Sequence, residues 1–181
     1  MARGLLKNDP APSDTLVAFA TRLGWMALVG SGDTLEQLTF GHPTAETALA
    51  ALDPALRRGA RRGTWNRPLV ARLKAYAAGR PDDFSDVPVD LGPLSPFRQR
   101  VIAGCRHIAL GQTKTYGELA ARAGSPRAAR AVGQCMAVNR IPLVVPCHRV
   151  VPAGGKLGGY SGGQGTAPKR QLLDMESSIT R

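Results

Sequence analysis

One short segment of the sequence carries side chains suited to nucleophilic chemistry. It reads Pro-Cys-His-Arg over residues 146–149 and has a pair of valines on each side. A neutral imidazole can take up a thiol proton, directly or through water, and only the resulting thiolate of Cys147 would attack a substrate. Neighbouring side chains point apart in an extended strand, so Cys147 and His148 must sit in a bend or use a water relay. The alternative is that Cys147 is an ordinary buried cysteine, which is a common state for this residue type.

A histidine that acts as a base needs a partner that orients and charge-balances its ring. Residues 95–181 contain only three acidic residues, of which Glu118 and Glu176 are the main candidates. A zinc site is not indicated, because Cys105, Cys135 and Cys147 lack the paired spacing of structural zinc sites. The glycine-rich residues 154–165 match neither a Walker A loop nor a dinucleotide-binding motif. The sequence therefore predicts chemistry without a metal or cofactor.

Positive charge is concentrated in the second half of the chain. Of the 181 residues, those from 1 to 94 hold 11 Lys and Arg against 10 Asp and Glu, whereas residues 95–181 hold 13 against 3. Such an excess favours a polyanionic partner for the second half, although a basic surface can also serve solubility alone.

The cysteines and the hydropathy pattern indicate the cell compartment. Three widely spaced cysteines do not suggest a disulfide framework, which favours the reducing cytoplasm over secretion. No apolar run approaches the roughly 18 residues needed to cross a bilayer. We therefore expect a cytoplasmic protein that does not contact membranes.

The second half reads as a series of helices. Ser95 and Pro96 suit the cap and first position of a helix that ends by Gly111. A helix from Tyr116 to about Ala123 follows a capping-box pattern, and the next runs from Ser125 to about Val138. Two helices joined by a tight turn predict a helix-turn-helix. A last helix is expected over Pro168 to Met175.

The helix expected from Ser125 has small side chains on one face. Ala128, Ala129 and Gly133 would let it approach a groove closely, while Arg127 and Arg130 lie on its early turns, where the helix dipole favours phosphate. An alanine-rich packing helix is the alternative. The basic surroundings favour DNA.

The first half has a different organisation. Residues 1–14 read as a tail, and residues 15–84 as a small domain with a strand meander followed by helices over Pro43 to Leu52 and Arg67 to Ala78. Residues 85–94 are a linker candidate, rich in Pro and Asp. Residues 95–181 then form the second domain.

These motifs resemble those of the O6-alkylguanine-DNA alkyltransferases, also called methylated-DNA–protein-cysteine methyltransferases. The resemblance is dense over residues 95–176 and holds only in pattern over residues 15–94. It rests on Tyr116-Gly117-Glu118-Leu119-Ala120, Ser125-Pro126-Arg127-Ala128-Ala129-Arg130-Ala131-Val132-Gly133, Asn139, Val145-Pro146-Cys147-His148-Arg149-Val150 and Gly159-Tyr160-Ser161-Gly162-Gly163.

The resemblance implies a fold and a partner. The first domain would be α/β and ribonuclease-H-like, with a small antiparallel sheet and helices. The second would be mainly α and winged-helix-like, with the helix-turn-helix presented to the minor groove of duplex DNA. A monomer would repair O6-alkylguanine by direct reversal, with O4-alkylthymine as a second candidate substrate, and would flip the base out of the stack to reach it.

The resemblance also assigns roles to individual residues. Cys147 would accept the alkyl group in a single turnover, His148 and Glu176 would relay its proton through water, and Asn139 would brace the turn. Tyr116 would push the target phosphate and give a proton to the leaving guanine. Arg130 would fill the space of the flipped base. Further contacts would come from the DNA-facing residues Ala128, Ala129, Arg127 and Gly133 and from the base-pocket residues Val150, Tyr160, Ser161, Lys169 and Met136.

One departure and two rival readings remain. Some relatives have Asn-Pro before the active-site strand, whereas Arg140 follows Asn139 here, which would shift the turn or add a phosphate contact.

One alternative function is that of an alkyltransferase-like protein that binds lesions without repairing them, although such relatives lack the acceptor cysteine. The other is a helix-turn-helix regulator that reads sequence in the major groove.

Overall fold

The first half of the chain forms a four-stranded sheet. The computed structural model describes residues 14–154, 157 and 166–180, so most of the expected tail lies outside it. Strands β1 (Thr15–Thr21), β2 (Gly24–Ser31) and β3 (Thr34–His42) form the expected antiparallel meander. The short β4 (Arg61–Arg62) adds to β1 in parallel, in the order β3-β2-β1-β4. The sheet is therefore mixed, which corrects the all-antiparallel expectation: the chain returns to the edge of β1 after a helical crossover.

Three helices accompany this sheet. Helix α1 (Ala45–Ala50) lies within the expected range and begins with a capping box between Thr44 and Thr47. Helix α3 (Arg67–Ala77) also matches its prediction closely. Helix α2 (Pro54–Gly59) was missed, although Asp53 caps it and Pro54 occupies its first turn, which are ordinary start signals.

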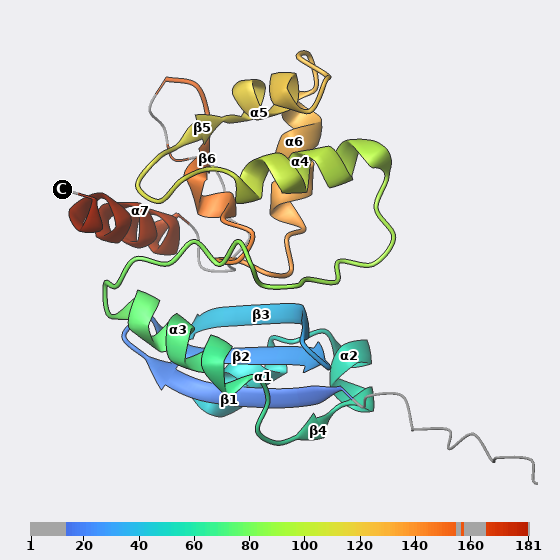
Figure 1. Ribbon diagram of the computed structural model, residues 1–181, viewed down its shortest axis with the longest axis vertical. Helices are drawn as coiled ribbons and strands as arrows, with labels where there is room; N and C mark the ends of the chain where they lie inside the picture. Colours follow the sequence, from blue (N-terminus) through green and yellow to red (C-terminus); the bar gives the residue numbers. More distant parts are fainter. Residues whose placement is uncertain (1–13, 155–156, 158–165, 181) are drawn as a thin grey trace, which may run out of the picture.

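The second half is mainly helical (Figure 1). It contains α4 (Pro96–Arg106), α5 (Tyr116–Arg122), α6 (Ala129–Ala137) and α7 (Ala167–Ile179), with a 3₁₀ turn η1 (Cys147–Arg149). Two short strands, β5 (Lys114–Thr115) and β6 (Val150–Val151), pair in parallel. Helices α5 and α6 pack together as the expected helix pair.

Two helix boundaries differ from the expectation. Helix α6 begins at Ala129 instead of Ser125, because Ser125 N–H bonds back to Ala120 and its carbonyl accepts from Ala128, which makes a turn of the intervening residues. Helix α7 continues past Met175 to Ile179 and so includes Glu176.

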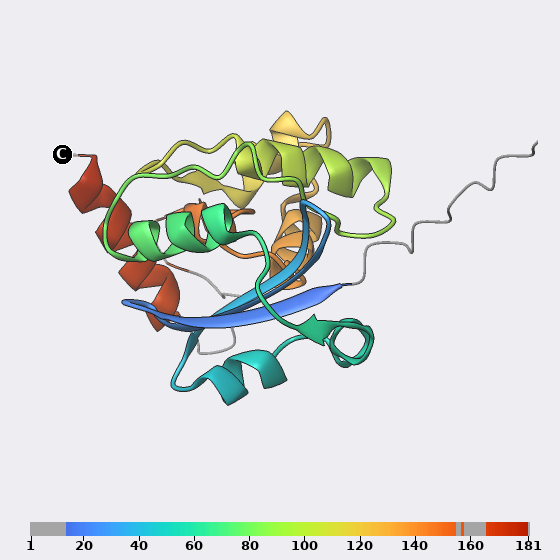
Figure 2. The ribbon, with the colours of Figure 1, turned by 60° about the horizontal axis from the view of Figure 1, so that its bottom comes forward.

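The core joins the two halves. Along β2, Met26 and Leu28 face the second half and belong to one buried cluster with residues such as Val101 and Cys147. Ala27 and Val29 face the opposite side and pack under α1. Figure 2 shows α1 and α2 on one side of the sheet and the helices of the second half on the other. The second half of the chain therefore packs on the face of the sheet opposite to α1 and α2.

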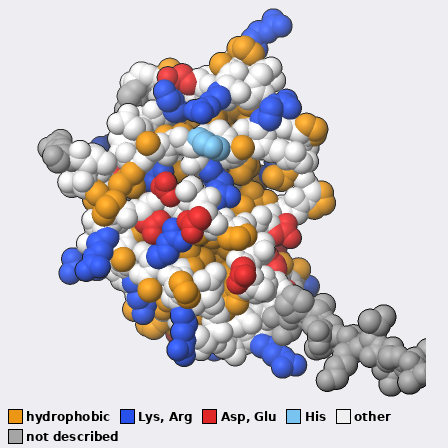
Figure 3. All heavy atoms as spheres, in the orientation of Figure 1, with side chains coloured by type: hydrophobic (Ala, Val, Ile, Leu, Met, Phe, Trp, Pro, Cys, Tyr) orange, Lys and Arg blue, Asp and Glu red, His pale blue; other side chains and the backbone are white. Residues whose placement is uncertain are grey.

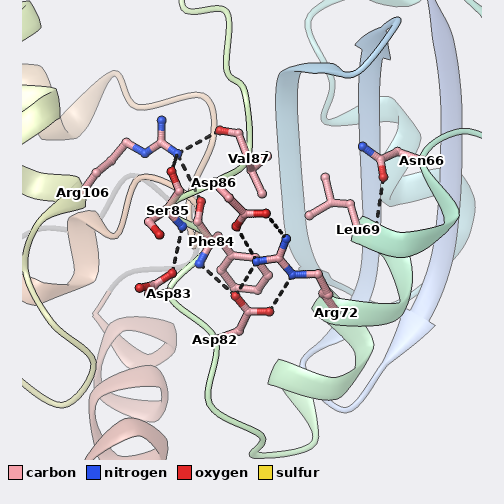
Figure 4. Close-up of polar contacts among 10 residues, drawn as sticks. All are labelled: Asn66, Leu69, Arg72, Asp82, Asp83, Phe84, Ser85, Asp86, Val87 and Arg106. Carbon is pink, nitrogen blue, oxygen red and sulfur yellow. Dashed lines mark hydrogen bonds and ion pairs between the residues drawn. The ribbon is translucent and has the colours of Figure 1, made fainter.

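The segment that connects the halves is bound to both (Figure 4). Arg72 of α3 makes 2.8 Å ion pairs with Asp82 and Asp86. Arg106 of α4 donates to the carbonyls of Phe84, Ser85 and Val87 at 2.8–3.1 Å. Further along, Leu35 of β3 exchanges backbone hydrogen bonds with residues 88 and 90. We call residues 82–90 the connecting segment.

Candidate active site

Cys147 lies in a buried bend that Asn139 holds in place. The 3₁₀ turn η1 supplies the bend that the sequence argument required, and the Cys147 side chain is buried. Asn139 Oδ1 accepts a hydrogen bond from Ile141 N at 3.0 Å, which orients the side-chain amide. Its Nδ2 then points to the bend, where it donates to Val145 O at 2.8 Å and to Cys147 Sγ at 3.1 Å. An N–H donor aimed at sulfur favours the thiolate over the thiol.

The loop before this turn is strained. Leu143 is buried and has a φ of +72°, in the left-handed region that non-glycine residues rarely adopt. Such strain costs on the order of 1–3 kcal/mol and persists only where surrounding contacts hold it. Here Val145 N bonds to Ile141 O at 2.9 Å across the bend.

His148 pairs with Glu176, which resolves the choice between the two carboxylates. Its Nε2 lies 2.9 Å from Glu176 Oε1, and both side chains are fully buried. Because a carboxylate only accepts, Nε2 carries the hydrogen and Nδ1 is left with its lone pair. Nδ1 is buried without a hydrogen-bond partner among the residues that the structure describes. Glu118 instead caps its own helix from an exposed position.

Glu176 lies among several donors. Arg149, which is also buried, donates from Nε and Nη2 at 2.8–3.2 Å, and Tyr76 of α3 donates its hydroxyl to Oε1 at 2.5 Å. The backbone N–H of Gly111 approaches Oε2 at 3.3 Å. Gly111 has a φ of +72°, and a side chain there would collide with Thr180, the residue directly after α7. The glycine therefore lets α7 bring its carboxylate to this position.

These contacts determine the charge states. Burial raises the pKa of the Glu176 carboxyl, but its bonds to His148 and Arg149 outweigh burial and hold the pKa far below the usual range. Burial lowers the pKa of His148 despite the opposing effect of Glu176. A neutral imidazole beside a carboxylate is the form that can accept a thiol proton.

A second group of predicted residues lies beside the cysteine. Lys169 is buried on α7, donates to Val150 O at 2.6 Å, and places Nζ 5.9 Å from the centre of the Tyr116 ring. Burial and then the charge of Cys147 raise the pKa of Tyr116, so this phenol keeps its proton at neutral pH. Gly133 of α6 faces the Tyr116 ring, since a Cβ on it would lie 4.0 Å from that ring. Met136 is buried on the same helix.

The predicted DNA-facing arginines lie on the surface, whereas Gly133 faces the Tyr116 ring and Ala128 packs against the core. Arg130 is exposed on the first turn of α6, whereas Arg127 is exposed in the turn before the helix, which corrects its expected place on the helix. Ala128 and Ala129 are half-buried. A surface hollow of about 450 Å³ is lined by residues 124–128. The predicted residues Tyr160 and Ser161 lie outside the described part of the chain.

On the face that Figure 3 shows, most acidic side chains lie across the middle of the molecule, and Lys and Arg side chains lie above, below and among them. Among the described residues, no three His, Cys, Asp or Glu side chains cluster in a way that could hold a metal ion. No helix in that part of the chain is long and apolar enough to cross a membrane.

Comparison with known proteins is consistent across sequence and structure. Residues 96–178 match the family model described as the DNA binding domain of 6-O-methylguanine DNA methyltransferase. A methylated-DNA–protein-cysteine methyltransferase of Mycobacterium tuberculosis is 40% identical over 158 residues, which are 86% of this chain and 88% of that protein. This chain belongs to the methylated-DNA–protein-cysteine methyltransferase family.

Solved structures agree with this assignment. The M. tuberculosis OGT structure in complex with DNA has a TM-score of 0.76 at 35% identity and covers 91% of this chain and 94% of that one. The O6-methylguanine-DNA methyltransferase of the archaeon Pyrococcus kodakaraensis has a TM-score of 0.66 at 25% identity, with 90% and 98% covered. The match to these methyltransferases therefore extends over both halves of the chain.

The residue that departs from the pattern of some family members leaves the Asn139 brace in place. Arg140, which follows Asn139, lies against the sheet, where its carbonyl accepts from Leu38 N of β3 at 3.0 Å. Its side chain lines a groove of about 350 Å³ between β3 and residues 137–142.

Two buried partners of Glu176 in this methyltransferase were missed by the sequence argument. The sequence could have indicated the role of Arg149, because a charged residue between two apolar pairs must find a buried counter-charge. It could not have indicated that of Tyr76, which fits the apolar stripe of α3 and is 100 residues away from Glu176 in the chain.

Proposed function

We propose that this protein repairs DNA by moving the alkyl group of an O6-alkylguanine to Cys147, once per chain. One observation carries the proposal: Cys147 Sγ accepts from Asn139 while the neighbouring His148 is held by Glu176. Family membership supplies the substrate class, since the relatives are named methylated-DNA–protein-cysteine methyltransferases.

The chemistry needs only the side chains of this site. The thiol proton passes to His148 Nδ1, directly or through a water, and the thiolate forms a sulfur–carbon bond while the carbon–O6 bond breaks. Guanine leaves as a neutral base if Tyr116 supplies a proton, which the imidazolium then restores through solvent. The thioether that remains has no carbonyl for water to attack. Each chain is therefore spent after one reaction.

The base must leave the DNA stack to reach this buried sulfur. We propose that α6 enters the minor groove, that its small residues Ala128, Ala129 and Gly133 permit close approach, and that Arg130 takes the space of the flipped base. Arg127 would contact phosphate. The net charge of +10 over residues 95–181, from 13 basic and 3 acidic residues, supports a polyanionic partner.

Val150, Lys169 and Met136, together with Tyr160 and Ser161, would line the base pocket.

In fold terms, we propose that residues 15–84 form a ribonuclease-H-like unit, residues 85–94 a linker and residues 95–181 a winged-helix-like unit. The protein would act as a cytoplasmic monomer on the nucleoid.

A titration of lesion DNA tests the proposed reaction. Increasing amounts of protein are mixed with a fixed amount of duplex containing one O6-methylguanine, and the repaired fraction is measured at the end point. We expect repair to rise linearly until one chain is present per lesion. Repair of many lesions per chain, or tight lesion binding without repair, would contradict the proposal, the second result being that of a lesion-flagging protein.

A further inference from the structure

The hydrogen bond between Tyr76 and Glu176 connects the two halves of the molecule at the site. Tyr76 lies on α3 in the first half and Glu176 on α7 in the second, and both side chains are buried. The hydroxyl donates to Oε1 at 2.5 Å, and the same oxygen lies 2.9 Å from His148 Nε2. Tyr76 therefore competes with the histidine for one carboxylate oxygen.

The surroundings fix the Tyr76 ring. The rings of Tyr76 and Phe84 pack in a T-shaped arrangement with centroids 5.4 Å apart, and the guanidinium of Arg72 lies 5.3 Å from the centre of the Phe84 ring. Arg72 is held in turn by Asp82 and Asp86, and Arg106 of α4 holds the backbone around Phe84 (Figure 4). The connecting segment thus orients Tyr76 toward the second half.

The charges around the Tyr76–Glu176 hydrogen bond determine which group donates and how the bond acts on His148. Burial and the neighbouring Glu176 raise the pKa of Tyr76, which keeps its hydroxyl protonated and acting as a donor. Glu176 also faces His148 and Arg149, while Lys169 and Arg149 are the cations whose charge acts on His148. Each donor on Oε1 draws negative charge away from the side that faces His148. A weaker carboxylate partner stabilises the imidazolium less.

We propose that Tyr76 is a positioning residue of the proton relay: its hydroxyl fixes the Glu176 carboxylate and limits how strongly that carboxylate makes His148 basic. The first half of the chain would thereby contribute directly to the chemistry of the second. This proposal rests on the function proposed above, because it gives Tyr76 a role in thiolate formation.

The test is to replace Tyr76 with phenylalanine, which removes only the hydroxyl. We expect the pKa of His148 to rise by about 0.5–1 unit, because Oε1 then loses one of its three donor groups and shares its charge only between the imidazole and Arg149. The chain has three histidines, so an NMR titration can follow each ring, and His42 and His107 serve as internal controls that should not change. The low-pH decline in the methyl-transfer rate should move to higher pH by the same amount.

The matched control is Leu73→Val, which loosens packing on the same buried helix without touching a polar group. An unchanged His148 pKa in Tyr76→Phe, or an equal shift in Leu73→Val, would overturn the proposal. If Tyr76→Phe does not fold, Phe84→Leu loosens the ring that orients Tyr76 and should shift the same pKa upward by less; no shift there counts against the proposal. The titration needs no DNA, so it stands even if the wild-type chain transfers no methyl group.

Discussion

The surroundings of Cys147 and the exposed start of α6 handle charge in opposite ways. At the cysteine, the buried Glu176 is bonded to the buried side chains of His148 and Arg149, and Tyr76 reaches it from the other half of the chain. At α6, Arg130 and the preceding Arg127 are exposed on the surface. Buried pairs resist displacement because breaking one leaves an uncompensated charge, whereas surface charges are free to exchange partners.

This difference separates two tasks. A nucleophile must be held in one geometry, which the buried network can do, and its loss should affect chemistry and stability together. A surface that binds a polyanion must release water and ions and adapt to the duplex, and its loss should affect binding alone. The variants below test whether the two regions separate in this way.

The largest effect is expected for Cys147→Ser. A hydroxyl is a far weaker nucleophile than a thiolate at neutral pH, so methyl transfer should fall below detection while lesion duplex is still bound. Transfer and binding are measured on the same labelled duplex. Cys135→Ser on α6 is the control, and it should retain transfer. Equal loss of transfer in both variants would show that the loss is not specific to Cys147.

Glu176→Gln should damage both chemistry and stability. The amide cannot balance Arg149, and an uncompensated buried charge costs about 3–5 kcal/mol. Denaturant unfolding measures this loss, and transfer should fall with it. Glu118→Gln, an exposed helix-capping carboxylate, should change transfer little. A stable, active Glu176→Gln protein would show that the buried network is dispensable.

Arg130→Ala should affect the handling of duplex DNA and leave the chemistry at Cys147 and the stability unchanged. Repair of duplex should slow by about tenfold, since unstacking a base costs a few kcal/mol, whereas reaction with a free O6-alkylated guanine should change little. The unfolding free energy should stay the same. The control is Arg57→Ala, another exposed arginine, on α2 in the other half. Equal losses on duplex and free base would argue against a role in flipping.

The smallest effect concerns pH. Burial places the folded pKa of His148 below its unfolded value of about 6.5, so acid protonates the unfolded chain first, and stability declines as pH falls below that value. The Glu176 pKa is also depressed, so its contribution is present above about pH 4.3 and is lost on further acidification. The transfer rate depends on the folded-state pKa of His148, which lies below the usual value, so it should be unaffected at pH 6.5 and decline only on further acidification. A rate that stays constant over the pH range in which an NMR titration shows the His148 ring taking up a proton, in a protein that remains folded, would remove His148 from the relay.

The sequence could predict those parts of the molecule that local signals specify. The Pro-Cys-His-Arg segment predicted a cysteine and a histidine held together in a bend, capping residues predicted α4 and α5, and an apolar stripe predicted α3. The choice between Glu118 and Glu176 was open from the residues themselves, because either acid could have reached the histidine. The alkyltransferase resemblance pointed to Glu176, and packing places Glu176 at the histidine.

Contacts between distant segments could not be predicted. Tyr76 reads as one more apolar position on α3, and nothing local indicates that its hydroxyl meets a carboxylate 100 residues later. Likewise, the composition of residues 85–94, rich in Pro and Asp, predicts a linker that overlaps the connecting segment. It does not show that Arg72 and Arg106 bind this segment from opposite halves.

The most direct test of the central claim is to locate the transferred group. The protein is incubated with duplex carrying O6-methylguanine labelled in its methyl group and is then digested, and the peptides are analysed by mass spectrometry. The account predicts one labelled methyl per chain, on the sulfur of Cys147, with Cys105 and Cys135 unmodified. Label on another residue, or no label on a folded protein that binds the lesion, would contradict it.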